Sequence, residues 1–502
     1  MNISHIFDNH PADAVALISR NRETTYGSLR DQIDALRGGL SSLGVRPGDR
    51  VALLCSNSRH FVITYFATVG LGAVAVPLNP LSPAFELQSE IAAVSAKVVV
   101  IEKLGAVTWS NVDRSLVPSV ETVVTTEQGS DIDDMQSIDD LIKAAPVPIV
   151  EVDPTADAAL IFTSGTAGLP RAARLTHGNV FANVEQSRLT GVLVADDLIY
   201  GVLPLFHIFG LNIVMTTGLA IGATVMLVQR FDPHTAAESI ASRQVTVVPG
   251  APGMWSAFTH FDELSADTFA SVRVALSGAS KLPVSVFTSM RDRFGIEIAE
   301  GYGLTETSAT VTTSLGAPIR PGSVGRAFEG IEIRLVNEDG RDVIVGDIGE
   351  IWVRGPNVFP GYDNDDAATA LVLTADGWLK TGDMAVVDDD GFLFLVDRAK
   401  DLVIVSGFNV YPAEVEDVLA MHPDVSEAGV VGVPHPHTGE AVKAFVVLEP
   451  GADVDEDTLI EFALDHVARY KCPSKVMFVD RLPRSTTGKL ARRRLDDALS
   501  VS

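Results

Sequence analysis

Short runs of β-branched and apolar residues recur between residues 50 and 276, and they alternate with segments that have the apolar spacing of helices, such as 28–43. This alternation constrains the fold most, because parallel strands need crossovers that helices usually supply. It predicts an α/β protein with layered parallel sheets. The runs expected to form strands are Arg50–Leu54, Ala73–Val76, Lys97–Ile101, Ala158–Phe162, Val245–Val248 and Val272–Leu276.

After about residue 320 the expected strands, such as Glu332–Leu335 and Gly349–Val353, are separated by turns rich in Gly and Asp. Turns of this composition are typical of antiparallel hairpins. A chain of 502 residues is also too long for one hydrophobic core. We therefore predict a large N-terminal domain of layered α/β subdomains plus a β-rich subdomain, and a small C-terminal α+β domain. The bounds are 1–396 for the first, with the β-rich part at about 320–396, 397–401 for a linker, and 402–502 for the second.

The composition excludes several classes of partner. Lys and Arg number 38 and Asp and Glu number 65, which gives a net charge of −27, so binding of nucleic acid or anionic lipid is not expected. Cys55 and Cys472 are too few for a disulfide framework, and the N-terminus lacks a secretory signal, so a reduced cytoplasmic protein is expected. We interpret the apolar stretches Phe61–Pro77 and Gly210–Val228 as buried core, the second as a helix followed by a strand, rather than as transmembrane segments.

The segment Phe162–Arg171, FTSGTAGLPR, is the sharpest local feature and follows an apolar strand. Its glycines let backbone N–H groups approach a ligand, its hydroxyls can donate hydrogen bonds, and Arg171 supplies positive charge. These groups suit a polyphosphate, although the Gly-Lys-Ser/Thr ending of a Walker A loop is missing. Taken alone, a solvent-exposed Ser/Gly turn is an equally good interpretation.

Four further segments carry groups suited to a nucleotide. Gly301–Glu306, GYGLTE, places an aromatic ring beside a hydroxyl and a carboxylate that could hold Mg²⁺. Trp378–Asp383, WLKTGD, ends on a carboxylate suited to accept hydrogen bonds from ribose hydroxyls. Asp397–Asp401, DRAKD, is a dense charge cluster at the domain boundary, and Pro483–Lys489, PRSTTGK, places a lysine on a loop near the C-terminus.

In this order, these segments resemble the adenylate-forming superfamily, which includes acyl-CoA synthetases, luciferase and peptide-synthetase adenylation domains. The resemblance covers roughly residues 20–495 and is strongest to fatty acyl-CoA synthetases. Several independent motifs at family-like spacing are far more specific than any single one. Further matching segments are LPLFHIFG at 203–210, SGAS at 277–280, GEIWVRGPNVFPGY at 349–362 and VSGFNVYPAEVE at 405–416.

The resemblance implies an AMP-forming acid–thiol ligase. Such enzymes join a carboxylate to ATP with release of pyrophosphate, and then pass the acyl group to coenzyme A. ATP, Mg²⁺ and coenzyme A would be the cofactors, a small carboxylic acid the substrate, and a second copy of the chain a candidate partner in a homodimer. The family's small domain rotates about a hinge that matches Lys400, so 397–401 is expected to be a hinge and 402–502 a mobile domain. The strand around Gly407 would then face a pantetheine tunnel.

The resemblance also implies catalytic roles. Thr305 would contact the α-phosphate, Glu306 would bind Mg²⁺, and Lys489 would neutralise the carboxylate and α-phosphate oxygens during adenylation. Asp383 would hold the ribose with the help of Arg398. The residues expected on the β- and γ-phosphates are Thr163, Ser164, Gly165, Thr166, Gly168 and Arg171. Those expected around adenine are Tyr302, which would stack on the base, its neighbours Gly301 and Gly303, and Gly278 and Ala279 in the 278–280 backbone.

Three positions depart from the family's usual phosphate loop, TSGTTGxPKG. Ala167 lacks a hydroxyl donor, and Arg171 keeps the charge in a forked form that is not equivalent to Lys. Ala172 is unfavourable if that position requires a positive φ. Activity is still expected, because the other motifs are intact. A non-catalytic protein that binds nucleotide or acyl-adenylate is the alternative from a different class.

The acid is expected to have an uncharged tail. Phe206, His207 and Ile208 offer no carboxylate to a substrate ammonium group, and burying that group unpaired is costly. An apolar tunnel between this segment and Pro249–Trp255 would suit a medium- or long-chain fatty acid. His207 is expected to gate this tunnel, with a hydrogen-bonded core histidine as the alternative. An aryl acid is the nearest rival substrate, and a carrier protein is the alternative acceptor.

Overall fold

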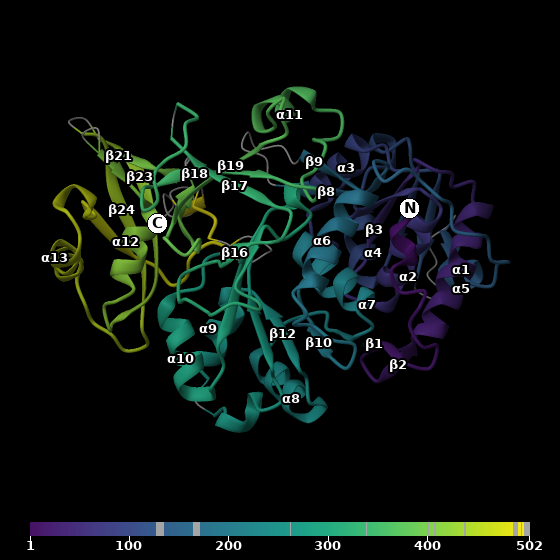
Figure 1. Ribbon diagram of the computed structural model, residues 1–502, viewed down its shortest axis with the longest axis horizontal. Coiled ribbons are helices and arrows are strands. Elements are labelled where there is room, and N and C mark those ends of the chain that lie inside the picture. Colours follow the sequence, from purple (N-terminus) through teal and green to yellow (C-terminus); the bar gives the residue numbers. More distant parts are fainter. Residues whose placement is uncertain are drawn as a thin grey trace.

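The computed structural model (Figure 1) describes most of the chain. The N-terminal part, in purple and blue, and the C-terminal part, in yellow-green, lie at opposite ends of the molecule, with the teal and green parts between them. The described residues are 1–126, 135–163, 171–261, 263–337, 339–398, 401–405, 408–435, 438–484, 490–492 and 494–495.

The first large sheet has the strand order β7-β6-β5-β3-β4-β8-β9, and its pairs are parallel except for β8 with β9. Helices pack on the sheet, so its central strands are buried and read as continuous apolar runs. The strands are β3 (Arg50–Leu54), β4 (Val74–Pro77), β5 (Val98–Ile101), β6 (Thr122–Thr125), β7 (Met135–Ser137), β8 (Asp157–Thr163) and β9 (Arg171–Thr176). The helices are α1 (Tyr26–Ser42), α2 (Arg59–Gly70), α3 (Ala84–Ala93), α4 (Lys103–Trp109) and α5 (Ile138–Leu141), with short 3₁₀ turns η1 (Ile3–His5) and η2 (Arg114–Leu116).

The second large sheet has the order β16-β15-β14-β13-β12-β10-β11-β1-β2 and is parallel from β14 to β1. Helix α6 begins after Thr176, whose hydroxyl accepts a hydrogen bond from the Asn179 N–H in a capping box. The strands are β1 (Val15–Ser19), β2 (Arg22–Thr25), β10 (Leu198–Gly201), β11 (Thr224–Leu227), β12 (Val247–Gly250), β13 (Val274–Ser277), β14 (Ile298–Tyr302), β15 (Thr312–Thr313) and β16 (Arg326–Ala327). The helices are α6 (His177–Leu189), α8 (Pro233–Arg243), α9 (Pro252–Thr259) and α10 (Val284–Phe294), with 3₁₀ turns η4 (Ala266–Phe269) and η5 (Thr305–Thr307).

The apolar stretch 210–228 is buried helix followed by strand, as predicted, but most of the helix is a π-helix. This helix, η3 (Phe209–Thr217), continues into α7 (Gly218–Ala220) before β11. A Cβ on Gly210 would lie 2.2 Å from the carbonyl oxygen of Pro204, so only glycine lets the helix begin this close to the preceding segment. Within the described part of the chain, no helix is long and apolar enough to span a membrane.

The remaining two sheets are mostly antiparallel. The β-rich part has the order β17-β18-β19-β20, and the C-terminal part has β22-β21-β24-β23 with β25 parallel to β24. The first two residues of the predicted linker 397–401 are the last two of β20, and residues 399–400 lie outside the described part of the chain, so the predicted domain bounds stay predictions. The elements are β17 (Glu332–Val336), β18 (Gly349–Arg354), α11 (Asp366–Val372), β19 (Leu379–Val387), β20 (Leu393–Arg398), β21 (Val403–Val405), β22 (Phe408–Val410), α12 (Pro412–Leu419), β23 (Val425–His435), β24 (Gly439–Leu448), α13 (Glu456–His466), η7 (Arg469–Lys471) and β25 (Lys475–Phe478).

Candidate active site

The predicted adenine-binding segments meet at one edge of the second sheet. β13 and β14 are parallel neighbours, so Gly278 and Ala279, which follow β13, lie beside Gly301 and Tyr302 at the end of β14. Ligands of open α/β sheets bind at this edge, outside the carboxyl ends of the strands. Ala279 has a φ of +71°, a left-handed conformation that costs energy for a residue with a side chain and is often found at functional sites.

Two of the predicted glycines lie against close neighbours, one against backbone and one against an aromatic ring. A Cβ on Gly303 would lie 1.5 Å from the carbonyl oxygen of Ala309, and a Cβ on Gly278 would lie 2.9 Å from the ring of Phe209. The backbone contact at Gly303 excludes a side chain whether or not a ligand binds, whereas a side chain at Gly278 would require the Phe209 ring to move.

Tyr302 and Asp383 come from different sheets and are joined by a hydrogen bond. The Tyr302 hydroxyl donates to Oδ2 of Asp383 over 2.8 Å, and each residue is only 7% exposed. Asp383 follows Gly382, which has a φ of +71°, and is paired with Arg398 in the ladder between β19 and β20. The structure therefore brings together the residues predicted for adenine and ribose, and it places the backbone of Arg398 opposite Asp383.

The carboxylate of Glu306 is held by a neutral donor. The Tyr362 hydroxyl donates to Oε1 of Glu306 over 2.7 Å, and the backbone N–H of Phe359 donates to the Glu306 carbonyl over 2.9 Å. Burial, followed by the negative charge of Glu306, raises the pKa of Tyr362 well above its ordinary value, so the hydroxyl keeps its proton. Thr305 precedes Glu306 in the same 3₁₀ turn, η5.

Arg171 lies beside this group at the start of β9, where it is paired with Thr163 of β8. Its Nε donates to Oδ2 of Asp365 over 3.2 Å, and its guanidinium carbon lies 5.8 Å from the ring centroid of Tyr362. Tyr362 reaches this place because it forms an isolated antiparallel bridge with β9. Arg171, which follows the glycine-rich segment, is thus linked to Glu306 through Tyr362.

Part of the predicted site lies outside the described residues, and its roles stay predictions. Lys281, just after the adenine segment, forms an ion pair of 2.5 Å with Asp417 of α12. This contact joins the C-terminal part of the chain to the same edge of the sheet. The predicted residues that are not described are Ser164, Gly165, Thr166, Gly168, Lys400, Gly407 and Lys489, and Arg398 is described only in its backbone.

His207 follows a segment that is anchored from the first sheet. The backbone N–H of Phe209 donates to Nδ1 of His207 over 3.3 Å, so this nitrogen is an acceptor. The Asn57 amide group donates to the carbonyls of Gly201 and Leu203 over 3.0 and 2.8 Å. The bond at Nδ1 fits the alternative of a core histidine, and the gating role stays a prediction.

Sequence reasoning missed Tyr362 and Asp365. Tyr362 ends the motif at 349–362, but its role depends on the pairing of this segment with β9, which the sequence does not show. Among the described residues, no group of three or more His, Cys, Asp or Glu side chains could hold a metal ion. One carboxylate, Glu306, still fits Mg²⁺, because Mg²⁺ is usually bound by one or two carboxylates together with substrate phosphates.

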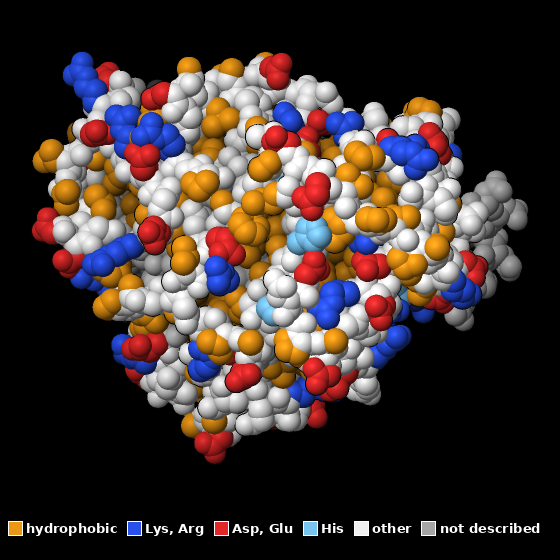
Figure 2. Space-filling model, turned by 45° about the vertical axis from the view of Figure 1, so that its right-hand side comes forward, with side chains coloured by type: hydrophobic (Ala, Val, Ile, Leu, Met, Phe, Trp, Pro, Cys, Tyr) orange, Lys and Arg blue, Asp and Glu red, His pale blue; other side chains and the backbone are white. Residues whose placement is uncertain are grey.

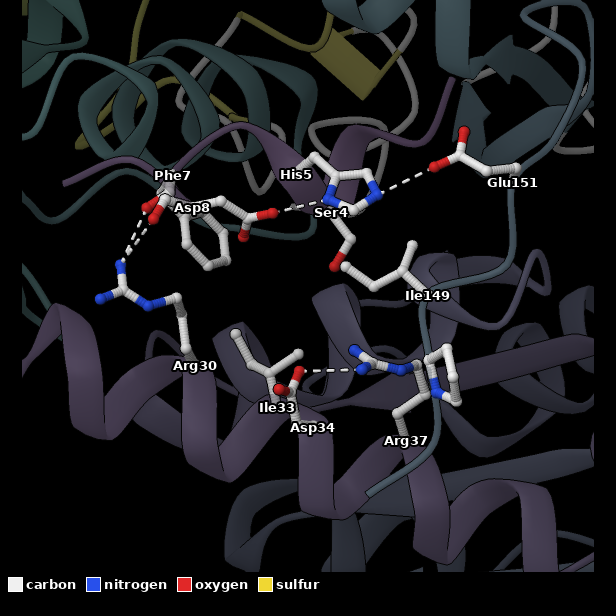
Figure 3. A pocket seen from close by; sticks show the side chains of 11 residues that line it. Ser4, His5, Phe7, Asp8, Arg30, Ile33, Asp34, Arg37, Ile149 and Glu151 are labelled. Atoms are coloured by element: carbon white, nitrogen blue, oxygen red, sulfur yellow. Dashed lines mark hydrogen bonds and ion pairs between the residues drawn. The ribbon is translucent and has the colours of Figure 1, made fainter. Parts of the chain in front are cut away.

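A cavity of about 470 Å³ lies elsewhere, between the N-terminal segment, α1 and residues 148–151 (Figure 3). Its charged side chains are already bonded: His5 lies 2.6 Å from Asp8 and 3.1 Å from Glu151, and Arg37 lies 2.9 Å from Asp34. Figure 2 shows Lys and Arg interspersed with Asp and Glu over one face of the molecule, so the acidic surplus forms no single patch on that face. None of the predicted site residues lines the cavity beside α1.

Two family models match the chain. Residues 4–363 match the AMP-binding enzyme model, and residues 414–489 match the model of the AMP-binding enzyme C-terminal domain. The chain belongs to the AMP-binding enzyme family. This confirms the predicted superfamily, and with it the predicted enzyme class, an AMP-forming acid–thiol ligase.

The AMP-binding enzyme is similar to other proteins over nearly its whole length. It is 33% identical to a long-chain-fatty-acid–CoA ligase of Bacillus subtilis (strain 168), over 96% of this chain and 91% of the relative. It is 36% identical to a feruloyl-CoA synthase of Amycolatopsis sp, over 93% and 92% of the two chains. The crystal structure of ATP-bound MatB from Rhodopseudomonas palustris matches with a TM-score of 0.92 and 31% identity, over 99% of both chains. The predicted α/β fold is therefore confirmed, whereas the relatives differ in the acid that they are named for.

Proposed function

We propose that this AMP-binding enzyme is an ATP-dependent acyl-CoA synthetase. It activates a carboxylic acid as acyl-AMP, releases pyrophosphate and transfers the acyl group to coenzyme A. The observation that carries the proposal is the presence of two groups in one region: the Tyr302–Asp383 pair, and Glu306 with Tyr362 and Arg171. The pair offers an aromatic ring and a carboxylate to a nucleoside. In the second group, the Glu306 carboxylate could hold Mg²⁺ and the Arg171 guanidinium could bind polyphosphate.

The nucleoside side of the site depends on Asp383. An ionised carboxylate has about four lone-pair positions, so the bond from Tyr302 fixes its orientation and leaves capacity to accept from ribose hydroxyls. The same bond fixes the phenol ring of Tyr302, against whose face adenine would stack. Arg398, paired with Asp383 across the ladder, would add a cation on the ribose side.

The first step brings two anions together. A carboxylate oxygen attacks the α-phosphorus, the bond to the bridging oxygen of the β-phosphate breaks, and pyrophosphate leaves. Positioning and charge neutralisation are therefore the contributions expected of the protein. Thr305 would donate to the α-phosphate, while Arg171 and Lys489 would add positive charge. Mg²⁺, held by Glu306, would supply further positive charge to the phosphate oxygens when it is bound.

In the second step the thiol sulfur of coenzyme A attacks the acyl carbon, and AMP leaves with the electrons of the carbon–oxygen bond. We propose that the C-terminal domain rotates about residues 397–401 between the steps, so that Lys489 serves the first and the strand around Gly407 the second. The bond between Lys281 and Asp417 would belong to one of these orientations. We also propose that the protein is cytoplasmic and that it forms a homodimer.

The acid is proposed to be a medium- or long-chain fatty acid. Trp255, in the segment predicted to border the tunnel, is 1% exposed, and its indole N–H donates to the Leu276 carbonyl over 3.2 Å, so its ring is buried and held in one orientation. One relative is named for long-chain fatty acids, which supports this choice. Another is named for a feruloyl group, so an aryl acid is the second candidate.

The test is pyrophosphate release from the full chain with ATP, Mg²⁺ and a panel of short- to long-chain saturated acids and aryl acids. We expect release that depends on the acid, and acyl-CoA when coenzyme A is added. The saturated acid of the preferred chain length should give the highest kcat/KM. Faster turnover of aryl acids would reassign the substrate. Acyl-adenylate that coenzyme A does not consume would favour a carrier-protein acceptor, and release with none of the acids would favour the non-catalytic alternative.

A further inference from the structure

The turn that carries Thr305 and Glu306 ends in an unusual backbone conformation. Ser308, which closes the turn, has a φ of +56°, and Ala309 has a φ of +112°. Conformations of this kind cost energy in residues with side chains, and they persist only where the surroundings hold them. The groups that hold this turn are therefore part of how Glu306 is placed.

Three buried asparagines bind the backbone of this turn. The Asn212 amide group donates to the Ser308 carbonyl over 2.6 Å, and the Asn357 amide group donates to the carbonyls of Thr307 and Thr310 over 3.0 and 3.1 Å. The Ser308 hydroxyl donates in return to the Asn357 carbonyl over 3.0 Å. The asparagine cluster is Asn183, Asn212 and Asn357, each with an exposed fraction of 0%.

Asn183 links the cluster internally. Its amide nitrogen donates to the Thr310 carbonyl over 2.7 Å. Its amide oxygen lies 3.3 Å from the backbone nitrogen of Thr310 and 3.3 Å from the amide nitrogen of Asn212, each of which donates to it. The carbonyls of residues 307, 308 and 310 are thus bound by side chains rather than by a regular helix or strand.

The three asparagines come from elements that are far apart in the sequence. Asn183 lies on α6, Asn357 lies between β18 and α11, and Asn212 lies on the π-helix η3. That helix begins at Phe209, two residues after His207, so it leads directly from the segment predicted to border the acid. π-helical turns are rare and often occur at functional sites. Through Asn212, the acid side of the site is in contact with the turn of Glu306.

The cluster is not the arrangement that stability alone would favour. The amide oxygens of Asn212 and Asn357 are buried, and no described group donates a hydrogen bond to either of them. A buried acceptor without a donor costs about 1–3 kcal/mol. The fold therefore keeps two asparagines whose buried amide oxygens lower its stability, which indicates that their donating N–H groups are needed.

We propose that the asparagine cluster positions the Thr305–Glu306 turn for Mg²⁺ and ATP, and that Asn212 couples this turn to the acid-binding segment through η3. The three asparagines are positioning residues, since they touch the turn rather than the reacting atoms. The proposal rests on the proposed function, because it takes Glu306 as the Mg²⁺ ligand.

The test compares Asn212→Ala with Thr217→Val in the full chain. Thr217 is a matched control, because it lies on the same helix, is fully buried, and its hydroxyl has no hydrogen-bond partner among the described residues. In Asn212→Ala we expect acid-dependent pyrophosphate release to fall by about 100-fold, the loss expected for a small misplacement of a catalytic group. The Mg²⁺ concentration for half-maximal rate should rise. Formation of acyl-CoA from supplied acyl-adenylate should fall much less, because Mg²⁺ and the pyrophosphate group take no part in it and only the contact of Thr305 with the α-phosphate is shared by the two steps. Thr217→Val should match the unmodified protein in all three assays.

A binding measurement separates this proposal from the proposed function. The affinity for ATP, measured by calorimetry with and without Mg²⁺, should increase with Mg²⁺ in the unmodified protein and in Thr217→Val, but not in Asn212→Ala. If the unmodified protein shows this increase and releases no pyrophosphate with any acid, the proposed function fails while the positioning role stands. An equal loss of pyrophosphate release in Asn212→Ala and Thr217→Val overturns the positioning role. A normal effect of Mg²⁺ on the ATP affinity of Asn212→Ala overturns it as well. If Asn212→Ala does not fold, Asn357→Ala loosens the same turn from the other side, and a normal Mg²⁺ response there has the same consequence.

Discussion

Two polar regions of the molecule use their charged groups differently. Around the N-terminal cavity, charges are matched by opposite charges, as in the ion pairs of the N-terminal amine of Met1 with Glu151 and of Arg37 with Asp34. In the candidate active site, the carboxylates of Glu306 and Asp383 are each held by the hydroxyl of a tyrosine. The Tyr362 hydroxyl fixes the Glu306 carboxylate without cancelling its charge, so this carboxylate remains able to attract a cation.

The difference shows why the N-terminal cavity is not the better candidate for catalysis. Arg30 donates to the backbone carbonyls of Phe7, Asp8 and His10 over 3.1 to 3.3 Å, which ties the N-terminal segment to α1 (Figure 3). Arg30, which lines the cavity, is thus engaged in holding the N-terminal segment in place. In the candidate site, by contrast, Ser308 and Ala309 next to the Glu306 turn have positive φ values, a costly conformation that is often found at functional sites.

The largest effect is expected for Glu306→Gln, which removes the charge and keeps the shape and an acceptor for Tyr362. Pyrophosphate release should fall by about 100- to 1000-fold, the usual loss when one electrostatic contact of a transition state is removed. The melting temperature should change little. Glu332→Gln is the control, because it removes a carboxylate from an exposed ion pair with Arg354. Equal activity of the two variants would contradict the assignment of Glu306.

A pH-dependent effect on stability is expected at Glu300, the residue before the GYGLTE motif. Burial raises its pKa from 4.5 to about 7, against the weaker effect of a hydrogen bond from the Leu282 N–H. A raised pKa means that this group contributes stability below pH 4.5 and loses it as pH rises through 7. Glu300→Gln should therefore raise the free energy of unfolding by on the order of 2–3 kcal/mol above pH 7.

The measurement is denaturant unfolding of both proteins at a series of pH values. The gain should shrink as pH falls from 7 and vanish below 4.5, where Glu300 is protonated in both the folded and the unfolded state. A gain that is the same at every pH would show that the ionised carboxylate is not what destabilises the protein.

The sequence predicted the strands better than the contacts between them. Arg50–Leu54 and β3 coincide because a strand buried on both faces is a continuous apolar run that turns interrupt at each end. The π-helix η3 was predicted only as a helix, since a fully apolar segment carries no periodicity that separates a π-helix from an α-helix. Tyr362 had no predicted role, because its place beside Glu306 depends on a bridge between segments far apart in the chain.

The candidate site was predicted in the same uneven way. Tyr302 and Asp383 were assigned to one nucleotide from motifs alone. In the structure the Tyr302 hydroxyl donates to Oδ2 of Asp383 over 2.8 Å, and their roles in binding stay predictions. The asparagine cluster could not be predicted, since Asn183, Asn212 and Asn357 have no common motif. Isolated polar residues in apolar segments, such as Asn212 in FGLNIVMTT, are a usable signal, because a buried amide needs partners.

The smallest effect is expected for Arg30→Met in the N-terminal joint, and it is the converse of Glu306→Gln. Methionine keeps most of the apolar length of the side chain but removes the hydrogen bonds from the guanidinium to backbone carbonyls. The free energy of unfolding should fall by about 1–2 kcal/mol, as for the loss of charged hydrogen bonds that are partly replaced by water. The kcat and KM of the folded protein should not change, because no residue of the candidate site contacts this joint through a described bond. Stability is read from denaturant unfolding and activity from pyrophosphate release at a temperature where both proteins are folded. A fall in kcat without a fall in stability would mean that the two polar regions are functionally connected, and the contrast between them would have to be abandoned.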